Sequence, residues 1–204
     1  MKHSATKLSC VGLLLAGSVL VLNGCGPKAF TKGEYDDPNR VELLDDKFNE
    51  ADMQKMAETA VKDILGSPVV LKSAEPPVVM VDRIANRTQE HIDTMMITNK
   101  TRTELIKSGK VHFVSKEDRE TLSAEYDYSD AGNVAPEKAL KRGKQASADY
   151  VLSGYLSSNI QEVGNQKYVY YIYTLNMVNT RRGTIDAVSE TQIRKGFRKR
   201  SVGL

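Results

Sequence analysis

The most restrictive feature of this sequence is a segment near its C-terminus, residues 168–178, in which alternate positions form an apolar and aromatic set. That set consists of Val169, Tyr171, Tyr173, Leu175 and Met177. Polar Thr174 and Asn176 stand between members of the set. Successive side chains of a strand point to opposite faces of its sheet, so this period of two predicts a strand with one buried face. A second layer from elsewhere in the chain must cover that face.

Two more strand-like segments flank this one. Residues 149–160 precede it and turn at Gly164 and Asn165, and residues 184–197 follow it after a second turn at 180–183. Short segments rich in Val, Ile, Tyr and Thr, separated by glycine turns, are typical of neighbouring antiparallel strands. The last third of the chain is therefore predicted to be a meander.

Helical spacing replaces this alternation near the start of the folded region. Apolar side chains between residues 52 and 65 recur every three or four positions, which predicts one helix with a continuous apolar stripe. The stripe consists of Met53, Met56, Ala57, Ala60, Val61, Ile64 and Leu65. Gly66 is suited to end this helix, and Pro68 does not continue it. We expect the stripe to lie in the core.

The middle of the chain predicts alternating strands and helices. We expect a strand over 78–84, where the residues form a mostly apolar run, and a helix that Thr88 caps and Gly109 ends. A second strand follows over 111–114. Because a helix of this length connects the two strands, they are predicted to be parallel neighbours.

Two further helices are expected before the meander. The hydroxyl of Ser115 can cap a helix over 116–126, and residues 126–135 are predicted to form a loop. Pro136 is suited to the first turn of another helix. That helix would contain Ala139, Leu140, Ala146 and Ala148. The whole pattern predicts an α+β fold with a mixed sheet of about five strands flanked by about four helices.

The N-terminus has the features of an export signal. Residues 1–24 contain Lys2 and Lys7 and then an apolar run of about a dozen residues, which is too short to span a bilayer. The run ends in Leu-Asn-Gly-Cys, which resembles the bacterial lipobox, so Cys25 is the expected lipidation site. Gly26 follows, not the aspartate associated with retention in the inner membrane, and this favours lipid anchoring in the outer membrane, facing the periplasm.

This interpretation divides the chain into three parts. They are a signal peptide over 1–24, a lipid-anchored flexible tether over 25–51 and a globular domain over 52–204. The sequence has two cysteines, and Cys10 would leave with the signal peptide. A lipidated Cys25 would then leave no free thiol for a disulfide, a zinc site or a thiol nucleophile.

Motifs for catalysis, metal binding or cofactor binding are not evident. His91 and His112 have no second ligand at a spacing suited to zinc, and the mature chain has no serine elbow or phosphate loop. A net charge of +3 is low for a nucleic-acid-binding protein. We therefore expect no catalytic residues, no metal, no cofactor and no nucleic acid partner. The carboxylates over 117–130 leave a cell-wall hydrolase as an alternative.

Two surfaces are candidates for binding a partner. The first is the loop 82–88, with Asp82, Asn86, Arg87 and Thr88. The second is the turn with Arg181 and Arg182, which begins a basic C-terminal cluster and lies beside a tyrosine-rich strand. Turn and capping chemistry is the alternative role for Asn86 and Arg87, and an idle hairpin tip is the alternative for the two turn arginines.

Three runs of sequence, together with the lipobox, resemble a known family. They are Val-Asp-Arg-Ile-Ala-Asn-Arg-Thr over 81–88, Gly-Lys-Val-His-Phe-Val-Ser over 109–115 and Ala-Asp-Tyr-Val-Leu-Ser-Gly over 148–154. They are similar to LpoB-type outer-membrane lipoproteins, which activate class A penicillin-binding proteins. Pieces of this kind also occur in the TolB N-terminal domain and in the curli secretion lipoprotein.

The resemblance implies a fold like the TolB N-terminal domain, no catalytic site, and binding to a noncatalytic domain of a class A penicillin-binding protein to regulate peptidoglycan synthesis. We expect a monomer. One departure is the tether. It is short in this chain, whereas the best-known members have a long, proline-rich tether. The alternative function is an envelope-assembly or secretion component related to the curli lipoprotein.

Overall fold

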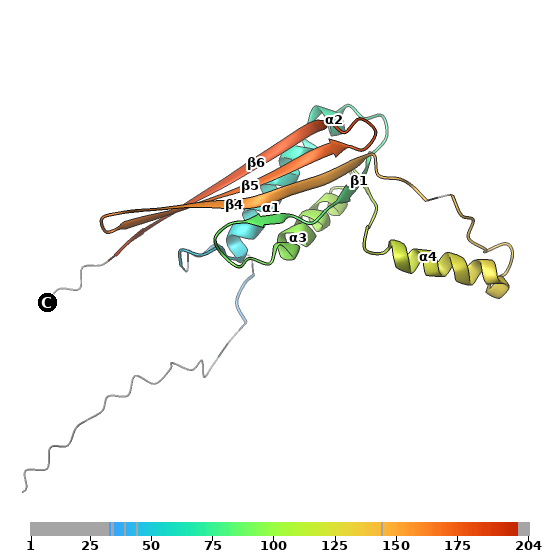
Figure 1. Cartoon of the computed structure of the whole chain (residues 1–204), viewed down its shortest axis with the longest axis horizontal. Coiled ribbons are helices and arrows are strands. Elements are labelled where there is room, and N and C mark those ends of the chain that lie inside the picture. Colours follow the sequence, from blue (N-terminus) through green and yellow to red (C-terminus); the bar gives the residue numbers. More distant parts are fainter. Residues whose placement is uncertain (1–32, 34, 39, 44, 144, 200–204) are drawn as a thin grey trace, which may run out of the picture. The chain divides into compact units, whose positions relative to one another are not determined.

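The computed structural model describes residues 33, 35–38, 40–43, 45–143 and 145–199 (Figure 1). Every helix and strand discussed below belongs to the unit that starts at Pro38. The expected signal peptide and Cys25 lie outside the described residues. Within the described ranges, no helix combines the length and apolar character needed to cross a membrane.

A six-stranded mixed sheet forms one layer of the fold, with the order β3-β1-β4-β5-β6 and with β2 pairing beside β4. The strands are β1 (Val78–Val81), β2 (Ala85–Arg87), β3 (His112–Phe113), β4 (Tyr150–Val163), β5 (Gln166–Asn179) and β6 (Ile185–Arg198). β1 is parallel to β3 and to β4, while β4, β5 and β6 are antiparallel. The α+β fold with a mixed sheet is therefore confirmed.

The C-terminal meander matches the sequence pattern. All five members of the alternating apolar set on β5 are buried, and Asn176 on the other face is half-buried. Gly154 on β4 is required for the close approach of β5, because a Cβ there would lie 2.1 Å from the backbone oxygen of Thr174. Gly164, with φ of 60°, forms the β4–β5 turn.

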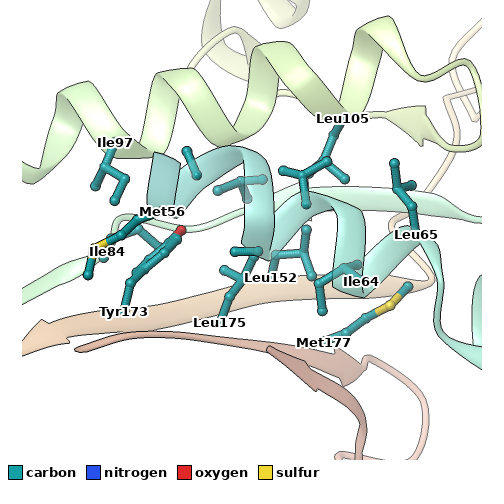
Figure 2. Close-up of a cluster of buried hydrophobic side chains, with 14 of the residues drawn as sticks. Met56, Ile64, Leu65, Ile84, Ile97, Leu105, Leu152, Tyr173, Leu175 and Met177 are labelled. Atoms are coloured by element: carbon teal, nitrogen blue, oxygen red, sulfur yellow. The ribbon is translucent and has the colours of Figure 1, made fainter. Parts of the chain in front are cut away.

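The second layer is built on α1 (Glu50–Leu65), which is confirmed with a start two residues earlier than expected. Asn49 and Asp52 form a capping box at its N-terminus, and Gly66 is its C-cap. The predicted stripe is buried apart from half-buried Met53. Figure 2 shows these side chains between the helices and the strands, with Met56 and Ile64 facing Tyr173 and Met177.

Two local predictions before the next helix are wrong. The strand stops at Val81, because the backbone N–H of Ile84 donates to Thr98 Oγ1 on α3 (Thr94–Lys107), and the chain then rejoins the sheet as β2. Thr88 does not cap the helix. Its hydroxyl bonds within the turn after β2, and Asp93 is the cap, accepting from Met95 N at 2.9 Å.

The region between β3 and β4 differs most from expectation. α4 (Arg119–Tyr128) begins after Asp118 and runs on into a π-helical turn, Ser129–Asn133, where a loop was expected. The described residues between 134 and 149 form no helix, so the helix expected after Pro136 is wrong. Gly143 has a φ of 78°, outside the helical region, and α4 buries none of its residues, so this part of the chain is not packed against the core that would stabilise a second helix. A short helix, α2 (Pro68–Leu71), appears instead after α1.

Candidate functional site

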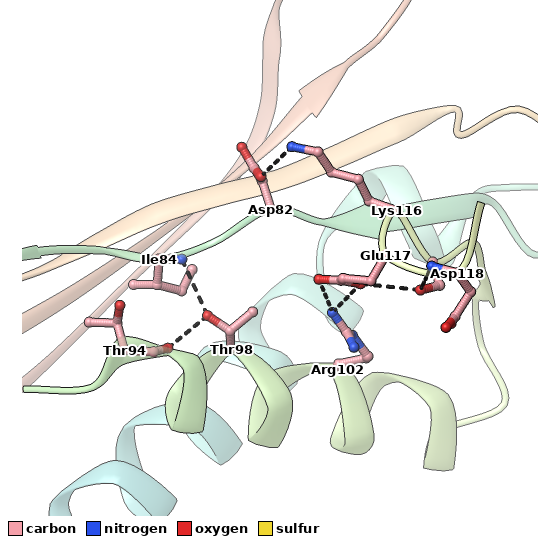
Figure 3. Close-up of polar contacts among 9 residues, drawn as sticks. Asp82, Ile84, Thr94, Thr98, Arg102, Lys116, Glu117 and Asp118 are labelled. Atoms are coloured by element: carbon pink, nitrogen blue, oxygen red, sulfur yellow. Dashed lines mark hydrogen bonds and ion pairs between the residues drawn. The ribbon is translucent and has the colours of Figure 1, made fainter. Parts of the chain in front are cut away.

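The loop that follows β1 is held by ionic contacts at its start. Asp82 accepts from Lys116 Nζ at 3.3 Å, and both side chains are exposed (Figure 3). Beside this pair, Arg102 on α3 donates to both carboxylate oxygens of Glu117 at 3.0 Å. A hydrogen bond from its own backbone, together with Arg102, holds the pKa of Glu117 below its ordinary value. Asp82 therefore helps to fasten the segment after β3.

Asn86 and Thr88 shape the turn that leads from β2 to α3. The side-chain oxygen of Asn86 accepts from the backbone N–H of Thr88 at 2.9 Å and from its hydroxyl at 2.8 Å. Asn86 Nδ2 donates to the backbone oxygen of Glu90 at 2.8 Å. These bonds use the polar groups of both side chains within the turn, as Asx turns do. Their observed role is structural.

Arg87 points away from this turn. Its guanidinium carbon lies 4.2 Å from the centroid of the Tyr155 ring. Arg87 pairs in register with Ser157 of β4, on the same face of the strand as Tyr155. Arg87 is thus the member of the predicted loop that reaches the face of the sheet opposite the helices.

Arg181 and Arg182 lie in the turn between β5 and β6, beside a surface groove of about 800 Å³. Each is close to a carboxylate: Arg181 is 3.8 Å from Asp149, and Arg182 is 2.5 Å from Asp186. Hydrogen bonds from Thr184 and then Arg182 lower the pKa of Asp186. The charge of this turn is therefore compensated locally.

The structure does not bring the two predicted surfaces together. Tyr150 of β4 lies opposite Asn179 at the Arg181 turn, whereas Arg87 lies opposite Ser157. Seven residues of strand separate these positions, or about 23 Å. The two predicted surfaces are therefore separate: one lies at the start of β4 and the other beside its middle.

A third surface joins residues that the sequence did not group. We call it the open face: the side of β4, β5 and β6 opposite α1 and α3. Tyr168 and Tyr170 lie on it, whereas their neighbours Tyr171 and Tyr173 are buried in the core. The period of two that predicts Tyr171 and Tyr173 to be buried also places Tyr168 and Tyr170 on the opposite face.

Arg194 brings positive charge to the open face from β6. It lies opposite Tyr170 in register, and its guanidinium carbon is 4.6 Å from the centroid of the Tyr168 ring. A hollow of about 420 Å³ lies here, lined by Asn159, Gln161, Tyr168, Tyr170 and Arg194. Neither Arg87 nor Arg194 forms an ion pair with any carboxylate in the part of the chain that the structure describes.

On the helix-covered face, the chain that enters α1 is fastened to the sheet. Lys195 on β6 donates to the backbone oxygen of Lys47 at 2.6 Å, and Lys167 on β5 lies 2.5 Å from a carboxylate oxygen of Asp46. The ring of Phe48 packs edge-on against Tyr171, with 5.4 Å between centroids. The globular unit therefore holds its incoming segment at a defined place on the sheet.

Comparison with known families gives one match. The family model described as the peptidoglycan-synthase activator LpoB matches residues 52–193. The matched range starts in the first turn of α1 and ends within β6, one residue before Arg194. No curated protein sequence matches the chain.

Solved structures similar to this chain include two of LpoB from Escherichia coli. The C-terminal domain is 19% identical, covers 70% of this chain and 98% of its own, and has a TM-score of 0.44. The NMR structure is 18% identical, and the match covers 94% of this chain and 96% of that structure, with a TM-score of 0.39. Lipoprotein GNA1162 from Neisseria meningitidis is 17% identical, and the match covers 59% of this chain and 84% of that protein, with a TM-score of 0.36.

Proposed function

Because this chain belongs to the LpoB family of peptidoglycan-synthase activators, we propose that it binds a class A penicillin-binding protein and raises the activity of that enzyme. The observation that carries the proposal is the extent of the family match, which spans the core helix α1 and the sheet as far as β6. The match therefore includes nearly all of α1 and most of the sheet, not an isolated motif.

An activator of this kind works through binding alone. It favours the more active state of an enzyme by binding that state more tightly than the less active one. This requires a rigid exposed surface and no chemistry of its own. The antiparallel strands β4, β5 and β6 offer such a surface, because each has 14 residues and their hydrogen-bonded ladders are nearly continuous.

The proposed location is the outer membrane, facing the periplasm, with a lipid on Cys25 as the anchor. The segment from Cys25 to Asp45 then acts as the tether, because Asp46 and the residues after it are held on the sheet. About 20 residues reach at most about 70 Å when fully extended. The synthase must therefore present its binding domain within that distance plus the length of the globular unit, measured from the outer membrane.

The test uses the mature chain, residues 25–204, carrying Cys25→Ser so that it stays in solution. Alone it should leave lipid II and peptidoglycan unchanged, and it should raise the rate of glycan polymerisation by a class A synthase from the same cell. Unchanged rates with every such synthase, while circular dichroism shows a folded protein, would reject the proposal. Ring-shaped oligomers in the same preparation would then favour the envelope-assembly alternative.

A further inference from the structure

We propose that the open face is the surface that binds the synthase, and that Arg87 and Arg194 bind carboxylates of an acidic patch on that enzyme. The inference rests on the proposed function and specifies where the partner binds. Arg87 comes from the loop 82–88 and Arg194 from the basic C-terminal cluster, and the structure adds the surface on which both lie.

The first step is the contrast between the two faces of the meander. On the covered face, Ser189 bonds to Asp63 of α1 at 2.7 Å and Tyr173 bonds to Thr101 of α3 at 3.1 Å, so helices occupy it. On the open face, Tyr155, Tyr168 and Tyr170 are only half-buried. Tyrosine and arginine are the residue types enriched at protein interfaces and among their energetic hot spots.

The second step is the rigidity of the Tyr168 ring. A Cβ at Gly196 would lie 3.3 Å from Cε1 of Tyr168, so the ring packs directly over this glycine of β6. Its hydroxyl donates to Gln166 Oε1 at 2.5 Å. Arg194 is stacked on the same ring. The guanidinium is thus positioned before any partner arrives, which reduces the entropy lost on binding.

The third step is a second site of the same kind. Arg87 lies over Tyr155, as Arg194 lies over Tyr168. Arg87 lies in the row of Ser157 and Arg194 in the row of Asn159, so the two are two residues apart along the strands, about 7 Å, and three strand spacings apart across the sheet, about 14 Å. Two stacked arginines at this separation fall within the area of about 800 Å² that a protein partner typically covers on one side.

The fourth step is charge. The described charged residues of the open face are Arg87, Arg194 and Arg198 against Glu190, so this face is net positive. The stacked arginines have no ion pair in the described ranges, whereas Arg181 and Arg182 are already beside Asp149 and Asp186. A planar guanidinium binds a carboxylate with two parallel hydrogen bonds. The complementary partner is therefore an acidic protein surface.

The stacking also argues against a sugar chain as the occupant. Arg87 and Arg194 each cover one face of a tyrosine, so a sugar ring could stack on that face of Tyr155 or Tyr168 only after displacing the arginine. Binding of the protein to purified peptidoglycan through this face is accordingly an outcome that would contradict the proposal.

The experiment measures binding of the mature chain with Cys25→Ser to the periplasmic part of a synthase that it stimulates. Arg87→Glu and Arg194→Glu should each weaken binding at least about tenfold and reduce stimulation in parallel. The matched control is Arg119→Glu, an exposed arginine at the start of α4, outside the strands that form the open face. It should bind like the parent chain, and all three should unfold at the same urea midpoint.

A second variant tests the geometry and leaves the charge unchanged. Gly196→Val places methyl groups against the Tyr168 ring and should weaken binding while both arginines remain. Parental affinity in all these variants would overturn the proposal. A loss of binding seen only in the double variant Arg181→Glu, Arg182→Glu would also overturn it. So would binding to peptidoglycan that depends on Arg194. In each case stimulation by the parent chain would leave the proposed function standing, so the two failures are distinguishable.

Discussion

Lys195 of β6 and Asp52 of α1 form an ion pair in the interior, with 2.5 Å between Lys195 Nζ and Asp52 Oδ2. The two residues are only 3% and 7% exposed. The same Asp52 carboxylate accepts from the backbone N–H of Asn49 in the capping box, at 3.0 Å. One lysine therefore joins the edge strand, the first turn of α1 and, through the backbone oxygen of Lys47, the incoming segment.

Replacing Lys195 should be among the most destabilising changes in this chain. Lys195→Met leaves the Asp52 carboxylate buried without its cation, which typically costs about 3–5 kcal/mol. Adding Asp52→Asn removes the unpaired negative charge and should restore part of the lost free energy of unfolding. The measurement is urea unfolding followed by circular dichroism.

The neighbouring residue provides a matched control for that experiment. Arg194 is on the same strand but on the open face and is exposed, so Arg194→Met should change the free energy of unfolding by no more than about 0.5 kcal/mol. Equal losses at positions 194 and 195 would contradict the buried pair.

A second prediction concerns pH. The hydrogen bond from Lys167 lowers the pKa of Asp46. A carboxyl group with a lower pKa in the folded state stabilises the fold above its unfolded pKa, and this contribution is lost as the pH falls through the folded value. The contribution should therefore be complete at pH 7, begin to fall near the unfolded value of about pH 4, and be lost as the pH falls through the lower folded value.

The variant that tests this is Asp46→Asn. It should be less stable than the parent chain at pH 7, and the difference should shrink as the pH is lowered to 3. Asp45→Asn is the control, because Asp45 is exposed and has no ion pair among the described residues. A difference between the parent and Asp46→Asn that stays constant from pH 7 to pH 3 would refute the role of the Asp46 carboxylate.

The core assignment of α1 makes a third prediction. Ile64 is 1% exposed on the buried stripe, so Ile64→Ala should cost about 2–5 kcal/mol. Leu71 is also aliphatic but is 62% exposed, and Leu71→Ala should change stability by no more than about 0.5 kcal/mol. Unfolding midpoints that coincide for Ile64→Ala and the parent chain would mean that the stripe does not carry the core.

The elements predicted correctly are those whose signal is local and repeated. The stripe of α1 and the alternation of β5 each recur over several turns or residues, and burial then follows the pattern. The failures come from tertiary competition. Thr88 has the chemistry of a helix cap, but pairing of β2 with β4 keeps the chain extended there and moves the cap to Asp93. The helix expected after Pro136 follows α4, which buries none of its residues, so no packing against the core stabilises a helix there.

The candidate site shows the same division. Arg181 and Arg182 were visible as a cluster because they are adjacent in sequence. The open face depends on register, since Arg194 meets Tyr168 only through the pairing of β6 with β5, and Arg87 reaches Tyr155 only through the pairing of β2 with β4. Alternation alone separates Tyr168 and Tyr170 from their buried neighbours, but it does not indicate which arginines lie above them.

The last prediction concerns the anchor, which rests on the lipobox alone because Cys25 lies outside the described residues. Cys25→Ser should abolish palmitate labelling and leave the protein either uncleaved or released into the periplasm. The fold should be unaffected, because every described helix and strand begins after this position, the first at Glu50. A released chain also loses its concentration near the envelope, so stimulation in cells should fall although the purified variant still stimulates the synthase in solution. Cys10→Ser is the control, since the expected cleavage removes it. Palmitate labelling that persists in Cys25→Ser would show that the lipid is attached elsewhere.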